Sequence, residues 1–124
     1  LKDNIKIIGY KKNPYPYLKK ADIFILSSKF EGLPNVLLEA QYLRKTIISS
    51  NCPTGPREIL LGGKAGFLFQ VGNVTELKNK ILFVTNKTNK KNINDKIKKG
   101  YDSIYRFGFN KNMNLYLNEV KKYL

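Results

Sequence analysis

Four short apolar runs along the chain predict β-strands. They occupy residues 5–9, 22–27, 46–50 and 65–69. The second run reads DIFILS and is apolar through its centre, as expected of a parallel strand covered on both faces. Helical patterns separate the runs. This alternation predicts an α/β fold, a Rossmann-like parallel sheet of about four strands flanked by helices.

Apolar residues at helical spacing predict the helices. The predicted ranges are 17–21, 34–43, 56–61 and 73–84, then a polar linker over 85–91, and two C-terminal stretches over 93–104 and 109–124. Asn73 has the position of a helix N-cap, and Glu76 three residues later would complete a capping box. A single domain over residues 1–124 holds these elements, with residues 93–124 as its C-terminal helices.

The stretch from residue 26 to 40 carries the most suggestive chemistry. It passes from an apolar run through a turn with Gly32 and Pro34 into an apolar helix that contains Glu39. The start of that helix offers free backbone N–H groups, an arrangement that binds anions and above all phosphate. These groups belong to Gly32, Leu33, Asn35 and Val36. Since Glu31 precedes and Glu39 follows them, the stretch suits a diphosphate with hydroxyl-rich sugars at both ends.

A plainer interpretation of the two glutamates stays open from the residues alone. Glu31 can be an exposed loop residue, and Glu39 a helix residue paired with a lysine. Two glutamates eight positions apart often occur by chance, so their spacing is weak evidence without its context.

Charge and composition limit the function classes. The net charge of +14, from 23 basic and 9 acidic residues, attracts the phosphates of nucleotide sugars, anionic lipids or nucleic acid. Only three of the basic residues are arginines, which sequence-reading proteins prefer for contacts to bases, and this favours solvated lysine faces over a nucleic-acid partner. The chain lacks histidine and an Asp-x-Asp motif, so the sequence suggests no metal or other cofactor.

The sequence also bears on location. The chain has no apolar run of about 18 residues and no signal peptide at its start. Its single cysteine, Cys52, favours a reducing compartment, so we expect a cytoplasmic location. Because the chain begins at Leu1, it reads as a fragment.

The stretch from 26 to 40 resembles the Glu–seven residues–Glu motif of the retaining, nucleotide-sugar-dependent glycosyltransferases of family 4, which have the two-domain GT-B fold. The resemblance covers roughly residues 5–84, because three further blocks occur in the family's order. These blocks are NPYPYLKKADIFILSS (13–28), TIISSNCPTGPREIL (46–60) and AGFLFQVGN (65–73). The resemblance implies a partial GT-B C-terminal domain, a truncated nucleotide-sugar-binding domain.

Roles for individual residues follow from this resemblance. Glu39 would hold the ribose hydroxyls of the nucleotide, and Glu31 would lie by the donor sugar and act at the reacting centre. Residues 32–35, that is Gly32, Leu33, Pro34 and Asn35, would line the sugar and diphosphate. Gly9 and Tyr10 lie where the family contacts the nucleobase, although a plain strand end explains them equally well.

The implied enzyme transfers a sugar from a nucleotide diphosphate, UDP rather than GDP, to a surface polysaccharide, lipopolysaccharide or lipid-linked glycan. An anionic membrane surface at the inner face of the membrane is a further candidate partner. The family's N-terminal acceptor domain would come from the same or a separate chain. The alternatives are a catalytically inactive remnant of such an enzyme or, less favoured, a basic nucleic-acid-binding module.

Two departures from the family pattern lead to expectations about the structure. Leu43-Arg44-Lys45 stands where the family has a small residue, Gly and Thr, which suggests a different end for the preceding helix. The first strands of the donor domain are also missing. We therefore expect residues 5–9 either to pair directly with residues 22–27 or to leave open edges through which chains associate.

Overall fold

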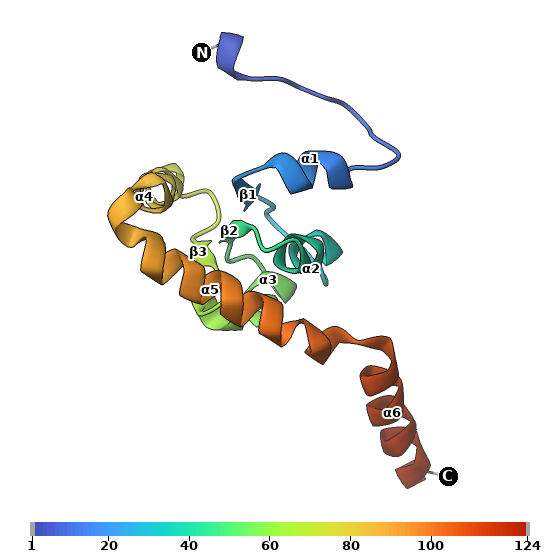
Figure 1. Ribbon diagram of the computed structural model, residues 1–124. Helices are drawn as coiled ribbons and strands as arrows, with labels where there is room; N and C mark the ends of the chain where they lie inside the picture. Colours follow the sequence, from blue (N-terminus) through green and yellow to red (C-terminus); the bar gives the residue numbers. More distant parts are fainter. Residues whose placement is uncertain (1, 124) are drawn as a thin grey trace.

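The computed structural model describes residues 2–123 and contains a parallel sheet with helices on both faces (Figure 1). The strands lie in the order β1-β2-β3. Their bounds are β1 Ile23–Leu26, β2 Thr46–Ser50 and β3 Phe67–Phe69. The helices are α1 Tyr15–Lys20, α2 Asn35–Tyr42, α3 Gly55–Ile59, α4 Val74–Thr85, α5 Lys90–Ser103 and α6 Phe109–Val120. Short 3₁₀ turns occupy η1 Lys2–Asn4, η2 Leu61–Gly63, η3 Lys87–Asn89, η4 Ile104–Phe107 and η5 Lys121–Tyr123.

The two faces of β2 define two apolar clusters. Ile47 packs with α1, α2 and α3 on one face, whereas the next residue, Ile48, packs with α4 and α5 on the other. The parallel register places Ile48 opposite Ile25 of β1 and Phe67 of β3. β2 is buried at Ile47, Ile48, Ser49 and Ser50 and is the centre of the sheet. The predicted α/β fold is confirmed.

Residues 5–9 do not form a strand, contrary to the prediction. They run as an exposed, irregular segment in which Ile7 is 93% exposed, and Figure 1 shows this segment leading away from the sheet before the chain returns as α1. A strand needs a neighbour that takes its backbone N–H and C=O groups, and in residues 2–123 no strand lies beside this segment. The sheet therefore has three strands rather than four. Of the two outcomes expected for residues 5–9, direct pairing with β1 is wrong, and association of chains through the open edge stays a prediction.

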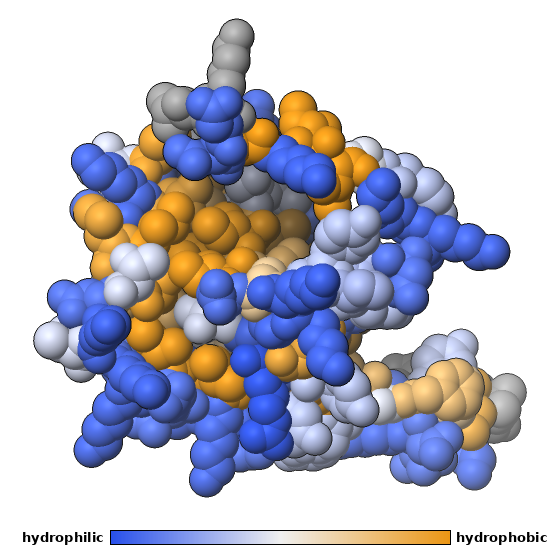
Figure 2. Space-filling model, turned by 45° about the horizontal axis from the view of Figure 1, so that its top comes forward, coloured by the Kyte–Doolittle hydropathy of each residue, from blue (hydrophilic) through white to orange (hydrophobic). Residues whose placement is uncertain are grey.

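One edge of β1 is consequently open. β1 pairs with β2 alone, and its residue Ile25 is 39% exposed. Figure 2 shows apolar side chains gathered around a hollow on one side of the molecule. An exposed strand edge beside apolar surface is a template for another strand.

One predicted linker and one predicted capping box differ from the structure for identifiable reasons. The expected linker over residues 85–91 is the short turn η3, in which Asn86 Oδ1 accepts a hydrogen bond from Thr88 N, and α5 begins directly after it. Asn73 caps α4 as predicted, because its Oδ1 accepts a 2.9 Å bond from Glu76 N. The carboxylate of Glu76, however, accepts from Gln70 N at 2.8 Å, so the capping box is not closed on Asn73.

The end of α2 keeps the geometry that a glycine would give, contrary to the expected change. Arg44 has a φ of +54°, and its N–H donates to the carbonyl of Gln41 while that of Lys45 donates to Ala40. These two bonds form a Schellman motif, which normally has glycine at the left-handed position. The Arg44 guanidinium lies 4.1 Å from the centre of the Tyr101 ring on α5, so the substituted side chain gains a cation–π contact.

The C-terminal helices differ in how they pack. Gly100 of α5 lies so close to α2 that an added Cβ would be 3.1 Å from Gln41 Nε2, and α5 thus crosses against the domain. α6 extends away from the sheet (Figure 1), with Phe109 and Tyr116 exposed. Among the described helices, none is long and apolar enough to cross a membrane.

Candidate functional site

The candidate site lies where β1 and β2 end, because both strands lead into loops at the same edge of the sheet. The turn after β1 runs from Glu31 to Pro34 and lies against the loop after β2. Glu31 N donates to Pro53 O at 3.0 Å, Thr54 N donates to Glu31 O at 2.8 Å, and Gly55 N donates to Gly32 O at 2.9 Å. These backbone bonds join two segments that are about twenty positions apart in the sequence.

Gly55 makes this close approach possible. A Cβ added there would lie 2.2 Å from Gly32 O and 2.6 Å from Pro34 Cδ. No side chain fits in that space, so the residue facing the turn has to be glycine. The loop after β2 therefore fixes the shape of the turn between the two glutamates.

Glu31 is oriented by the end of β1. Ser28 Oγ donates a 2.6 Å hydrogen bond to Glu31 Oε1. The backbone of Ser28 is held in turn, because the buried Ser50 hydroxyl donates to Ser28 O at 2.6 Å. Within residues 2–123 no donor contacts Glu31 Oε2, so that oxygen is available to a ligand.

The start of α2 presents free amides, as the sequence predicted. Pro34 is the N-cap residue of α2, is buried, and makes no side-chain cap. Gly32, Leu33 and Asn35 are exposed. Leu37 N donates to Pro34 O at 2.9 Å, whereas the amides of Gly32, Leu33, Asn35 and Val36 donate to no carbonyl or side chain in the described part of the chain. Unpaired amides at a helix start attract anions.

Glu39 lies one helical turn into α2 and is half-buried. Tyr15 OH donates to Glu39 Oε1 at 3.3 Å, so the partner of this carboxylate is a phenol from α1 and not a lysine. Glu39 lies on the wall of two hollows of about 480 and 280 Å³. The larger hollow is lined by Tyr15, Leu38, Glu39, Tyr42, Leu43 and Ile104.

Gly9 and Tyr10 lie apart from these groups. Both belong to the exposed segment before α1, where Gly9 has a φ of +60° and Tyr10 is 91% exposed. Neither residue makes a described contact with Glu31 or Glu39. The structure thus joins Glu31, the turn and Glu39 in one region, and it leaves the predicted nucleobase contacts outside it.

Three contributors to the site were missed from the sequence. They are Ser28, Gly55 and Tyr15. Hydroxyl residues and glycines are too common to stand out, although the GP and NP pairs beside Gly55 and Tyr15 marked turns near them.

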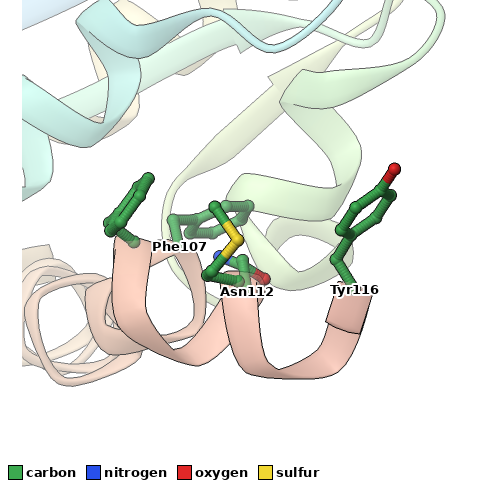
Figure 3. A pocket seen from close by; sticks show the side chains of 5 residues that line it. Phe107, Asn112 and Tyr116 are labelled. Carbon is green, nitrogen blue, oxygen red and sulfur yellow. The ribbon is translucent and has the colours of Figure 1, made fainter. Parts of the chain in front are cut away.

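Other features of the chain carry no comparable chemistry. A hollow of about 380 Å³ beside α6 is lined by Phe107, Phe109, Asn112, Met113 and Tyr116 (Figure 3). It shares no residue with the region of the two glutamates and contains no carboxylate or amine. Among the described residues, no group of three or more His, Cys, Asp or Glu side chains could hold a metal ion.

Similar proteins share the fold and parts of the sequence. An uncharacterized glycosyltransferase of Methanocaldococcus jannaschii is 48% identical over 60 residues, which are 48% of this chain and 15% of that protein. A Campylobacter jejuni N-acetylgalactosamine-N,N'-diacetylbacillosaminyl-diphospho-undecaprenol 4-alpha-N-acetylgalactosaminyltransferase is 32% identical over 73 residues, 59% of this chain and 20% of its own length. The chain thus spans a fifth or less of these relatives.

A solved structure has the same fold over the whole chain. The crystal structure of Anabaena HepE in complex with UDP superimposes with a TM-score of 0.79 at 19% identity, over 100% of this chain and 34% of HepE. The sequence profile described as "Glycosyl transferases group 1" matches residues 1–101. With that profile matched over most of its length, the chain belongs to the group 1 family of glycosyltransferases.

Proposed function

We propose that the chain binds the nucleotide-sugar donor of a retaining, family 4 glycosyltransferase that needs no metal. The observation that carries this proposal is the pair of carboxylates, Glu31 and Glu39, on either side of the free amides at the start of α2. A diphosphate accepts hydrogen bonds from amides, and carboxylates accept them from sugar hydroxyls. A nucleoside diphosphate sugar contains these groups in the required order.

Each carboxylate has a separate role in this proposal. Glu39 accepts hydrogen bonds from the ribose hydroxyls of the donor, which we propose to be UDP-linked. Glu31 lies beside the transferred sugar, where the negative charge of Oε2 stabilises positive charge that develops at the anomeric carbon. The backbone N–H groups of Gly32, Leu33, Asn35 and Val36 stabilise the leaving diphosphate.

The acceptor is proposed from the relatives. The Campylobacter enzyme is named for transfer to a diphospho-undecaprenol-linked acceptor in an alpha linkage. We therefore propose a polysaccharide, lipopolysaccharide or lipid-linked glycan as acceptor, bound by a further domain in this or another chain, with the anionic membrane surface nearby.

Titration of the chain with UDP, followed by NMR, tests the donor site. Amide shifts should centre on residues 31–39, and Glu39→Ala should weaken binding about tenfold or more, because a charged acceptor of two hydroxyls is lost. Asp95→Ala, an exposed carboxylate on α5, is the matched control and should bind as the wild type does. Unchanged shifts in Glu39→Ala would refute the assignment. Binding to DNA or RNA with no response to UDP would support a nucleic-acid-binding module instead.

A further inference from the structure

The carboxylate of Glu39 has an asymmetric environment. Its Oε1 accepts the 3.3 Å bond from Tyr15 OH, whereas no donor in residues 2–123 contacts its Oε2. The residue is half-buried between two largely apolar hollows, in which a carboxylate needs a hydrogen-bond donor. One oxygen is thus held by the protein, and the other is available.

The position of Tyr15 is fixed independently of Glu39. Tyr15 is the first residue of α1, and its N–H donates to Asn13 Oδ1 at 3.1 Å. Leu18 anchors the middle of α1 in the apolar cluster, and Lys45 Nζ donates to the Lys19 carbonyl at its C-terminal end. The backbone that carries the phenol is therefore held by the fold, and the hydroxyl reaches the carboxylate of a neighbouring helix.

Tyr17 shows that this contact is specific to one tyrosine of α1. Tyr17 has nearly the same exposure, 47% against 49% for Tyr15. It lines the smaller hollow on the other side of Glu39, and its hydroxyl bonds to no described residue. Two tyrosines on one helix thus flank the same carboxylate, but a single one bonds to it.

We propose that Tyr15 is a positioning residue, whose hydroxyl holds Glu39 in the rotamer that turns Oε2 toward the ribose diol of the donor. This inference rests on the proposed role of Glu39. A carboxylate that is already oriented loses less rotational freedom when the ligand binds. A site arranged to accept bonds from hydroxyls also rejects analogues that lack them, because its polar atoms are then left unpaired. Tyr15 therefore contributes to selection of ribose hydroxyls without touching the nucleotide.

The test compares UDP with 2′,3′-dideoxy-UDP, each titrated by calorimetry into the chain. The wild type should prefer UDP. Tyr15→Phe should reduce the ratio of the two affinities about three- to tenfold, the effect of one lost hydrogen bond. Tyr17→Phe is the matched control and should keep the wild-type ratio.

The outcomes separate this inference from the proposed function. A wild-type ratio in Tyr15→Phe, or an equal loss of affinity for both nucleotides, would overturn the positioning role, because a merely structural tyrosine affects both alike. Glu39→Gln distinguishes the two proposals. If Glu39→Gln loses the preference for UDP while Tyr15→Phe keeps it, the role of Glu39 stands and that of Tyr15 falls. If Glu39→Gln keeps the preference, or the wild type has none, both proposals fail.

Discussion

Ser28, two residues after β1, holds Glu31 by a 2.6 Å hydrogen bond from its hydroxyl to Oε1. The bond links a residue whose backbone the sheet fixes to the carboxylate proposed to act at the reacting centre. Tyr15 plays the corresponding part for Glu39 from a different element. Each glutamate of the pair thus has one oxygen held by a hydroxyl and one oxygen unpaired within the described chain.

Ser28→Ala should slow sugar transfer more than it weakens donor binding. For the proposed sugar transfer, we expect turnover to fall about tenfold while the affinity for UDP changes less than about twofold. The lost bond orients Glu31, and its loss does not affect Glu39. Steady-state kinetics and calorimetry provide the two measurements. Ser27→Ala, the exposed neighbour, is the control. An equal loss of turnover and affinity would contradict the orienting role.

Gly55→Ala should destabilise the fold, since its Cβ would lie 2.2 Å from a backbone oxygen of the turn. We expect a loss of about 3 kcal/mol in the free energy of unfolding, as for overpacking of a rigid contact. Gly32→Ala is the control for stability, because nothing lies within 4 Å of a Cβ added there. Its free energy of unfolding should lie within about 0.5 kcal/mol of the wild-type value. Urea unfolding compares the two. Similar midpoints for both variants would show that the turn and loop separate easily.

Two substitutions at Arg44 separate the steric cost of its left-handed backbone from the stability that its side chain gains by contacting Tyr101. Arg44→Ala keeps the left-handed φ and loses the contact with Tyr101, so we expect a loss of about 0.5–1 kcal/mol. Arg44→Gly loses the same contact but removes the steric cost, which should make it about 1 kcal/mol more stable than Arg44→Ala. Urea unfolding of both variants gives the difference. If Ala proves as stable as Gly, the αL conformation is not maintained in solution.

Lys96 should make stability depend on pH in the alkaline range. Burial, with the charges of Lys99 and Lys80, lowers the pKa of Lys96 below 10.5. The unfolded state, where the pKa returns to its usual value, binds more protons between the lowered pKa and 10.5. The contribution of Lys96 to stability therefore rises with pH across that window.

Lys96→Met isolates this effect, because it keeps an unbranched side chain and removes the ammonium, which lies 5.0 Å from the centre of the Phe67 ring. The wild type should gain stability relative to Lys96→Met as the pH is raised from neutral toward 10.5. Urea unfolding over this range measures the difference, with Lys98→Met on the exposed side of α5 as the control. A difference between wild type and Lys96→Met that does not change with pH would exclude the burial of this charge.

The sequence by itself determined the alternation of the fold and the central motif. The β2 strand has the predicted bounds, and α1, α2, α3 and α4 lie within about two residues of their predicted ranges. These elements are predictable because the apolar periodicity that specifies each of them lies within a short stretch of sequence. The position of Glu31 and Glu39 around a helix start was predictable for the same reason, since turn and helix follow each other directly.

Tertiary structure decided which local patterns were used. Residues 5–9 have a strand's composition, but pairing depends on a neighbouring strand, and local sequence contains no information on whether one is present. Arg44 adopts a conformation expected of glycine, and its side chain contacts Tyr101, which lies far along the chain. The hydrogen-bond partners of the two glutamates show the same contrast between local and distant contacts. Ser28 is three residues from Glu31, whereas Tyr15 reaches Glu39 from 24 positions away, and only the packing of α1 on α2 brings them together.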